Sequence, residues 1–166
     1  MSKNSYSFVL AILICAFSSS ILAQETCLQN AWKAYESDDY VNSIRYADQC
    51  IDDFGRKAMA IQQDCIQKGI PKPKLPITTD VERKKVFDRG LLNDVATACF
   101  VKGRSAESLY KKNKALNKSY KTMAEDAYNM ACQYYYGLCW DPKGWFWSPC
   151  EAASDRLSLI TKDKKE

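Results

Sequence analysis

The chain repeatedly places apolar residues at helical spacing, and in two segments these residues form two adjacent stripes instead of one. In the first segment one stripe holds Cys27, Ala31 and Ala34, and the next holds Leu28, Trp32 and Tyr35. In the second, Leu91, Val95 and Ala98 lie beside Leu92, Ala96 and Cys99. A helix that is apolar over so wide an arc packs against neighbours on more than one side. No segment has a convincing strand pattern, so we predict an all-α fold of about six helices arranged as antiparallel hairpins.

Turn-forming residues divide the first part of the chain into helices and a linker. The acidic segment ESDDY, residues 36–40, is predicted to be a turn, and residues 41–54 have one apolar helical face. Gly55 interrupts this pattern, which resumes and runs to Gly69. The three prolines of IPKPKLP prevent helix formation and favour an extended chain. We therefore predict a Pro-rich linker over residues 70–78 between two helical units.

Capping residues mark two helix starts in the second unit. Thr79 and Glu82 have the spacing of a capping box and predict the start of a long helix, while polar residues around 111–119 predict a bend. Ser148, followed by Pro and Glu, predicts the start of the last helix. The apolar stripe of that helix consists of Ala153, Leu157 and Ile160. Its opposite side is polar, as expected of a C-terminal helix that caps a helical stack.

Residues 1–23 have the three-part pattern of a secretory signal peptide. They contain one basic residue, Lys3, then an apolar run over 8–17, and they end on the small residue Ala23. The alternative is a membrane anchor, which a run of about half the length of a bilayer span disfavours. We predict cleavage after Ala23, a secreted or periplasmic location, and a single domain over 24–166 that does not span a membrane.

Two segments resemble tetratricopeptide (TPR) repeats, in which small residues lie where paired helices approach closely. In AWKAYESDDYVNSIRYADQCIDDF the resemblance rests on Ala31, the Ala34-Tyr35 pair, Tyr40, Ser43, Ala47 and Cys50. In KTMAEDAYNMAC it rests on Ala124, Tyr128 and Ala131. The chain departs from the repeat at Ala47, where an aromatic residue is usual, and the linker breaks the 34-residue period. The ending WDPKGWFW.P.EAA is similar to one found in exported TPR-like proteins of bacteria.

The resemblance implies a TPR-like stack of hairpins whose first helices line a concave, peptide-binding face. It places Trp32 and Tyr35 on that face, together with Leu28 of the same stripe. In the alternative interpretation, the C-terminal part of the chain covers these side chains and they belong to the core.

Three consecutive aromatic residues, Trp145, Phe146 and Trp147, form a second candidate site inside the segment CWDPKGWFWSPC. Tryptophan suits contact with sugars or peptides because it combines a large area with a polar edge. An exposed apolar patch of this size also invites aggregation, so the segment can instead be a partly buried plug. If it is extended, Trp145 and Trp147 point to one side and Phe146 to the other.

Removal of residues 1–23 leaves seven of the eight cysteines, and in an exported protein these are disulfide candidates. In an antiparallel hairpin, residues equidistant from the turn lie level with each other, which pairs Cys27 with Cys50 across the acidic turn. The remaining candidate pairs are Cys99–Cys132 across the basic bend and Cys139–Cys150 around the aromatic segment, with Cys65 left over.

The residue content excludes several function classes. The chain has no histidine, which rules out Ser-His-Asp and Cys-His catalysis and the common Cys/His zinc sites. Its glycines are scattered singly and form no phosphate loop. Neighbouring carboxylates occur in turns and on polar helix faces, where solvated surface explains them best. We therefore predict no catalytic activity, no metal site and no cofactor.

Charge is unevenly distributed along the chain. Residues 36–64 carry seven acidic and three basic residues, whereas residues 102–121 carry seven basic residues and one acidic residue. These segments are either solvated helix faces or surfaces that dock on charged partners or on other copies of the chain. Nucleic acid is not an expected partner of an exported protein.

These observations predict a non-catalytic exported module that binds a protein or a peptide. The alternative is a glycan- or cell-wall-binding protein that uses the aromatic residues Trp145, Phe146 and Trp147. The first hypothesis requires Trp32 and Tyr35 for binding, and the second requires Trp145 or Trp147.

Overall fold

The structure is a computed structural model that describes residues 27–115 and 117–162. A helical segment over 27–36 is followed by α2 (Tyr40–Gln67), α3 (Asp80–Phe87), α4 (Gly90–Lys112), α5 (Lys118–Gln133) and α6 (Pro149–Lys162). The predicted all-α class is therefore confirmed. The predicted signal segment 1–23 lies outside the described residues. None of the helices within the described ranges has the length and apolar character needed to cross a membrane.

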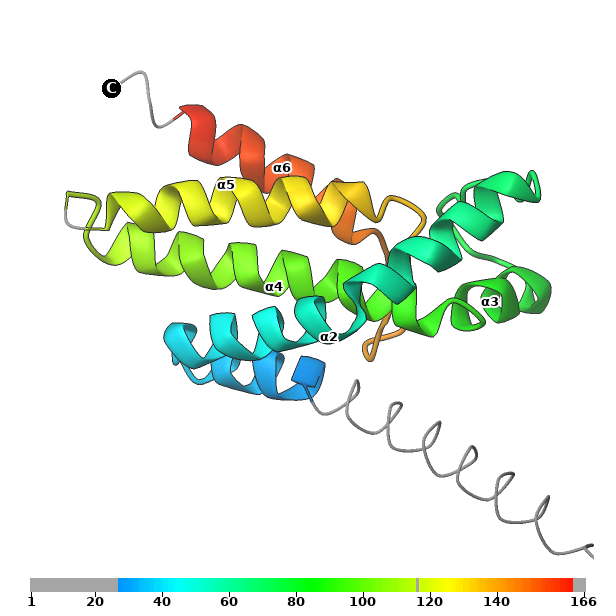
Figure 1. Ribbon diagram of the computed structural model, residues 1–166, viewed down its shortest axis with the longest axis horizontal. Helices are drawn as coiled ribbons and strands as arrows, with labels where there is room; N and C mark the ends of the chain where they lie inside the picture. The colour runs from blue at the N-terminus through cyan, green and yellow to red at the C-terminus, as the bar shows by residue number, and fades with distance from the viewer. Residues whose placement is uncertain (1–26, 116, 163–166) are drawn as a thin grey trace, which may run out of the picture.

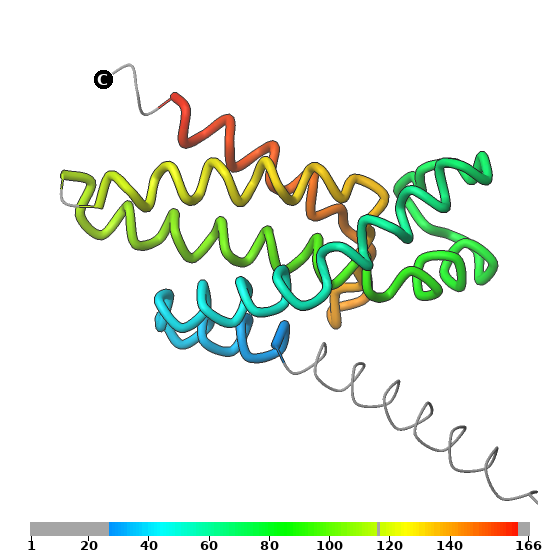
Figure 2. Tube along the Cα trace, in the orientation of Figure 1, coloured from blue at the N-terminus to red at the C-terminus, as the bar shows by residue number. Residues whose placement is uncertain are grey.

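The helices lie side by side, and α4 occupies the middle (Figure 1). It packs against α2 on one side and against α5 and α6 on the other. This position explains why the sequence of α4 carries two apolar stripes, of which Leu92, Val95 and Cys99 are completely or almost completely buried. The chain path in Figure 2 places α3 and the C-terminal half of α2 together at one end of the molecule. The α6 helix lies on the outside of α5, with Ala153 and Ile160 buried.

The predicted helix break at Gly55 is wrong, because α2 continues through this residue as far as Gln67. Gly55 is buried, and a Cβ atom at this position would lie 3.0 Å from Tyr134 Oη. The Tyr134 hydroxyl donates a hydrogen bond to the Gly55 carbonyl oxygen over 3.3 Å. The glycine therefore permits a close approach between α2 and the end of α5, and it does not end the helix.

The capping box at Thr79 is confirmed, but the long helix predicted to follow it is wrong. The Thr79 hydroxyl accepts from the Glu82 backbone N–H, and the Glu82 carboxylate accepts from the Thr79 N–H. The helix that begins here is α3, which ends after 8 residues. Asn93 of α4 donates through Nδ2 to the Val86 carbonyl oxygen (2.8 Å) and so satisfies an acceptor at the end of α3.

A short β-hairpin between α5 and α6 corrects the prediction that no segment forms a strand. Strands β1 (Cys139–Asp141) and β2 (Trp145–Trp147) pair antiparallel, with Trp140 opposite Phe146. The turn is closed by a hydrogen bond from Gly144 N to Asp141 O (2.9 Å) and by one from Lys143 N to Asp141 Oδ1 (2.8 Å). Gly144 adopts φ 108°, a conformation that side-chain-bearing residues rarely adopt.

The cysteines follow the prediction at one pair and depart from it at the others. Cys27 and Cys50 form a disulfide with a Cα–Cα distance of 5.7 Å, which ties the 27–36 segment to α2. The structure does not join Cys139 to Cys150, because Cys139 Sγ lies 2.7 Å from Thr97 Oγ1 and Cys150 Sγ faces Cys132. The predicted Cys99–Cys132 pair is not formed either.

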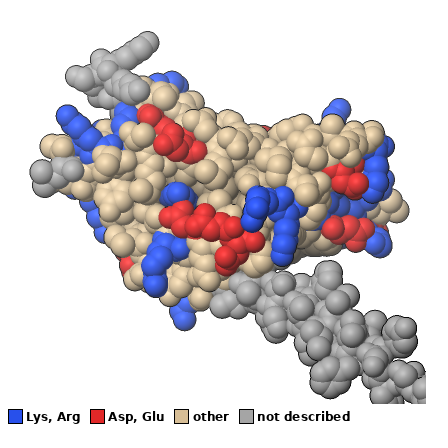
Figure 3. Space-filling model, in the orientation of Figure 1, with Lys and Arg blue, Asp and Glu red and all other residues tan. Residues whose placement is uncertain are grey.

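Complementary charges from the two unevenly charged segments meet on the surface. Figure 3 shows acidic and basic side chains next to each other across the middle of one face. Lys102 of α4 pairs with Asp48 of α2 at 2.6 Å. Because α2 packs on α4, part of the opposite charge of residues 36–64 and 102–121 is balanced within the molecule.

Candidate functional site

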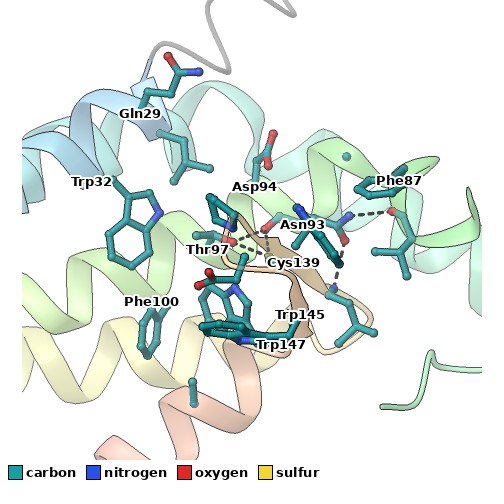
Figure 4. A pocket seen from close by; sticks show the side chains of 18 of the residues that line it. Gln29, Trp32, Phe87, Asn93, Asp94, Thr97, Phe100, Cys139, Trp145 and Trp147 are labelled. Atoms are coloured by element: carbon teal, nitrogen blue, oxygen red, sulfur yellow. Dashed lines mark hydrogen bonds between the residues drawn. The ribbon is translucent and has the colours of Figure 1, made fainter. Parts of the chain in front are cut away.

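A cavity of about 830 Å³ lies between the 27–36 segment, the first half of α4 and the β-hairpin (Figure 4). Its lining includes all four tryptophans of the chain, Trp32, Trp140, Trp145 and Trp147. The two candidate sites predicted from the sequence, the Trp32 stripe and the aromatic segment, therefore meet in one place.

Leu28 and Trp32 of the 27–36 segment form one wall. The Cys27–Cys50 disulfide fixes this segment on α2, and the Ser43 hydroxyl donates to the Ala31 carbonyl oxygen over 2.9 Å. The disulfide holds the start of the segment on α2, and the hydrogen bond holds it at the residue before Trp32. The position of this wall consequently depends on α2 as well as on the segment itself.

Tyr35, predicted to share the binding face with Trp32, is not among the lining residues. Its ring meets Trp32 edge-on at 5.9 Å, and its hydroxyl accepts a hydrogen bond from Arg104 Nη2 over 2.7 Å. The Arg104 guanidinium also lies over the Tyr35 ring. Tyr35 therefore supports Trp32 from behind and connects it to α4.

The floor of the cavity comes from α4, whose Asp94 and Thr97 lie between Trp32 and the hairpin in Figure 4. Asn93 connects this floor to the hairpin, because its Oδ1 accepts from the Leu138 N–H over 3.2 Å. Thr97 donates to the Asn93 carbonyl oxygen (2.8 Å) and contacts Cys139 Sγ. The start of β1 is thus fixed to α4 by polar contacts.

The hairpin forms the other wall. Its side chains alternate between the two faces, as the sequence predicts for an extended segment. Trp147 packs edge-on against Phe100 of the floor at 5.3 Å, and Trp145 on the same face is 49% exposed. Phe146 points to the opposite face, where it is 9% exposed and packs with Val86 and Leu138. The aromatic segment therefore combines a buried side chain at Phe146 with an accessible one at Trp145.

The charged residues of the lining are mostly acidic. Glu36, Asp94 and Asp141 contribute carboxylates, and Lys33 contributes an ammonium group. An apolar surface with this charge favours a ligand that combines apolar groups with positive charge.

Cys139 is the thiol of the lining, and burial raises its pKa to about 12, so it is protonated at neutral pH and a poor nucleophile. Among residues 27–115 and 117–162 no group of three His, Cys, Asp or Glu side chains is arranged to hold a metal ion.

Sequence reasoning missed several lining residues. Trp140 carried a signal, since it flanks the turn sequence DPKG and precedes the other aromatic residues by a few positions. Phe87 and Phe100 had none, because each belongs to an apolar pattern that a helix core explains equally well.

No protein-family model, curated protein or solved structure matches the chain. The residues of the cavity are therefore the basis for inferring function.

Proposed function

We propose that this chain is a non-catalytic exported module that binds an extended segment of a partner protein in the cavity between Trp32 and the hairpin. The observation that carries the proposal is the meeting of all four tryptophans at one open cavity, although Trp32 and Trp145 are far apart in the sequence. Tryptophan is among the residues that contribute most to binding energy at protein interfaces.

The size and charge of the cavity support a peptide ligand. Its volume, about 830 Å³, falls in the range of about 300–1,000 Å³ that is typical of ligand pockets. The excess of carboxylates in the lining favours a peptide that carries Lys or Arg beside apolar residues. The Cys27–Cys50 disulfide is compatible with an oxidising compartment, where such a partner would be met.

Selection from a random peptide library against the immobilised 24–166 chain tests the proposal. Peptides that bind should be enriched in aromatic or aliphatic residues accompanied by Lys or Arg. We expect Trp32→Ala and Trp145→Ala each to weaken the selected peptides by about tenfold or more in Kd, because removing a central tryptophan commonly costs about 2 kcal/mol.

Leu159→Ala is the matched control, since Leu159 is also a large apolar side chain, is 50% exposed, and lies on α6 outside the lining. It should leave the affinity unchanged. The proposal would be overturned by a library that yields no binder. It would also be overturned by peptides that bind both tryptophan variants as tightly as the parent chain.

A glycan ligand is the second candidate, and the exposed end of the hairpin favours it. Trp140 and Trp145 are 42% and 49% exposed, and Asp141, which follows Trp140, lies directly opposite Trp145 in the hairpin register. Aromatic faces beside a polar acceptor also suit sugar rings. Titration with cell-wall oligosaccharides should then change the tryptophan fluorescence, and Trp145→Ala or Trp147→Ala should abolish the change. No fluorescence response would exclude this candidate.

A further inference from the structure

The two cysteines at the facing ends of α5 and α6 lie unusually close together. Cys132 is the second-last residue of α5 and Cys150 is the second residue of α6, and their sulfur atoms are 2.6 Å apart. Even carbon atoms, which are smaller than sulfur, stay about 3.5–4.0 Å apart when they are not bonded. A disulfide bond measures about 2.05 Å, so bonding requires an approach of about half an ångström.

We infer that Cys132 and Cys150 form a second disulfide that closes the loop carrying the aromatic hairpin. Packing holds both residues in place, because α5 and α6 pack against each other and Cys132 Sγ also lies 3.1 Å from the Cys150 carbonyl oxygen. Cys139, the nearest alternative in the sequence, is engaged instead with Thr97. The remaining cysteines, Cys65 and Cys99, are buried.

The bond forms by thiol–disulfide exchange with an external disulfide, such as oxidised glutathione or an oxidised thiol–disulfide oxidoreductase. One of the two cysteines attacks that disulfide as a thiolate, which gives a mixed disulfide and releases one thiol of the oxidant. The other cysteine then attacks the mixed disulfide and releases the second thiol. Cys132 and Cys150 together lose two electrons and two protons, and the oxidant gains both.

The bond would tie together the two ends of the segment that supplies one wall of the cavity. The two cysteines are 18 positions apart, and the loop between them contains Trp140, Trp145 and Trp147. A cross-link across such a loop restricts the unfolded chain and fixes the place where the hairpin leaves the helices. It complements Cys27–Cys50, which fixes the opposite wall.

Non-reducing peptide mapping of the 24–166 chain, after refolding with oxidised glutathione, tests the inference. Free thiols are alkylated under denaturing conditions before digestion. Trypsin alone leaves Cys132 and Cys139 in one peptide, residues 122–143, so chymotrypsin is added to cleave at the intervening tyrosines. We expect Cys132 in a cross-link with Cys150, and Cys139 alkylated.

Two variants provide the controls. Cys139→Ser should keep the cross-link to Cys150, whereas Cys132→Ser should lose it. If a variant folds poorly, the mapping of the unmodified chain still tests the inference. A cross-link between Cys139 and Cys150, or complete alkylation of both Cys132 and Cys150 after the glutathione treatment, would overturn the inference.

Discussion

At the scale of single residues, glycines, which lack a side chain, determine how closely the helices approach each other. Gly103 of α4 faces the ring of Tyr128 on α5, and a Cβ atom at Gly103 would lie 2.5 Å from two carbons of that ring. Tyr128 is completely buried, and its hydroxyl is held by Glu107, so the ring cannot easily move away. Substitution at Gly103 must therefore push the two helices apart.

We predict that Gly103→Ala destabilises the fold by about 1–3 kcal/mol, the usual cost of overpacking a core. In a chain of this size the melting temperature should fall by about 5 °C or more. Gly90→Ala is the matched control, because Gly90 also belongs to α4 and a Cβ atom there would meet no atom within 4 Å. Equal melting temperatures for the two variants would contradict the packing described for α4 and α5.

At the scale of secondary structure elements, one buried carboxylate joins three helices. Glu107 of α4 is 2% exposed and accepts hydrogen bonds from Tyr128 of α5 (2.7 Å) and from Arg156 Nε of α6 (2.9 Å). Lys111 Nζ also contacts its Oε1 atom at 2.6 Å. Burial alone would raise the pKa of Glu107, but the hydrogen bonds from Arg156, Lys111 and Tyr128 outweigh burial and lower the pKa to about 2.

This lowered pKa predicts how stability depends on pH. Glu107 ionises more readily in the folded chain than in the unfolded chain, so its stabilising effect is complete above the ordinary pKa of 4.5 and is lost as the pH falls towards 2. The loss amounts to about 3 kcal/mol at most. Urea unfolding at pH 7 and at successive steps below pH 4.5 measures it.

Glu107→Gln should be less stable at pH 7 and should lose most of this dependence on pH. Asp155→Asn, which replaces an exposed carboxylate on α6, serves as the control and should behave as the parent chain does. A parent chain whose stability is constant from pH 4.5 to pH 2 would show that Glu107 does not link the helices in this way.

Some secondary structure elements could be predicted from the sequence, and others were ambiguous in it. The cap at Thr79 depends on residues three positions apart and the Cys27–Cys50 pair on the register of a single hairpin, and both were predicted. The hairpin was missed although DPKG has the Asp, Pro and Gly positions of a turn. Three-residue strands are too short for a clear alternation. Gly55 was misinterpreted because glycine ends helices and also permits close helix contacts, and the sequence does not distinguish the two.

At the scale of the whole molecule, the cavity depends on contacts between distant segments. Trp32 and Trp145 were both predicted as binding residues, but nothing in the sequence places them at the same cavity. Their meeting depends on Asn93, which attaches the hairpin to α4, and on Arg104, which supports Trp32 through Tyr35. Such polar contacts have no periodic signature, so the composition of the cavity could be predicted only in part.

The fold also predicts where a protease first cleaves the chain. Residues 113–117 connect α4 to α5, and both Lys112, just before this connection, and Lys114, within it, are exposed. Surface connections of this kind open more easily than helices that pack on several neighbours. Limited trypsin digestion should cut between 111 and 118 before it cuts anywhere in 83–101. First cuts at Lys102 or Arg104, the basic residues in the middle of α4, would contradict the central position of this helix.

The central claim is that the cavity between Trp32 and the hairpin binds a peptide, and the indole N–H signals of the ¹⁵N-labelled 24–166 chain test it most directly. The chain has four tryptophans and all of them line the cavity, so every indole signal reports on the site. Addition of a library-selected peptide should shift the signals of Trp32, Trp145 and Trp147 in a saturable way. Unchanged indole signals at a peptide concentration that saturates binding would show that the peptide binds elsewhere, and would contradict the claim.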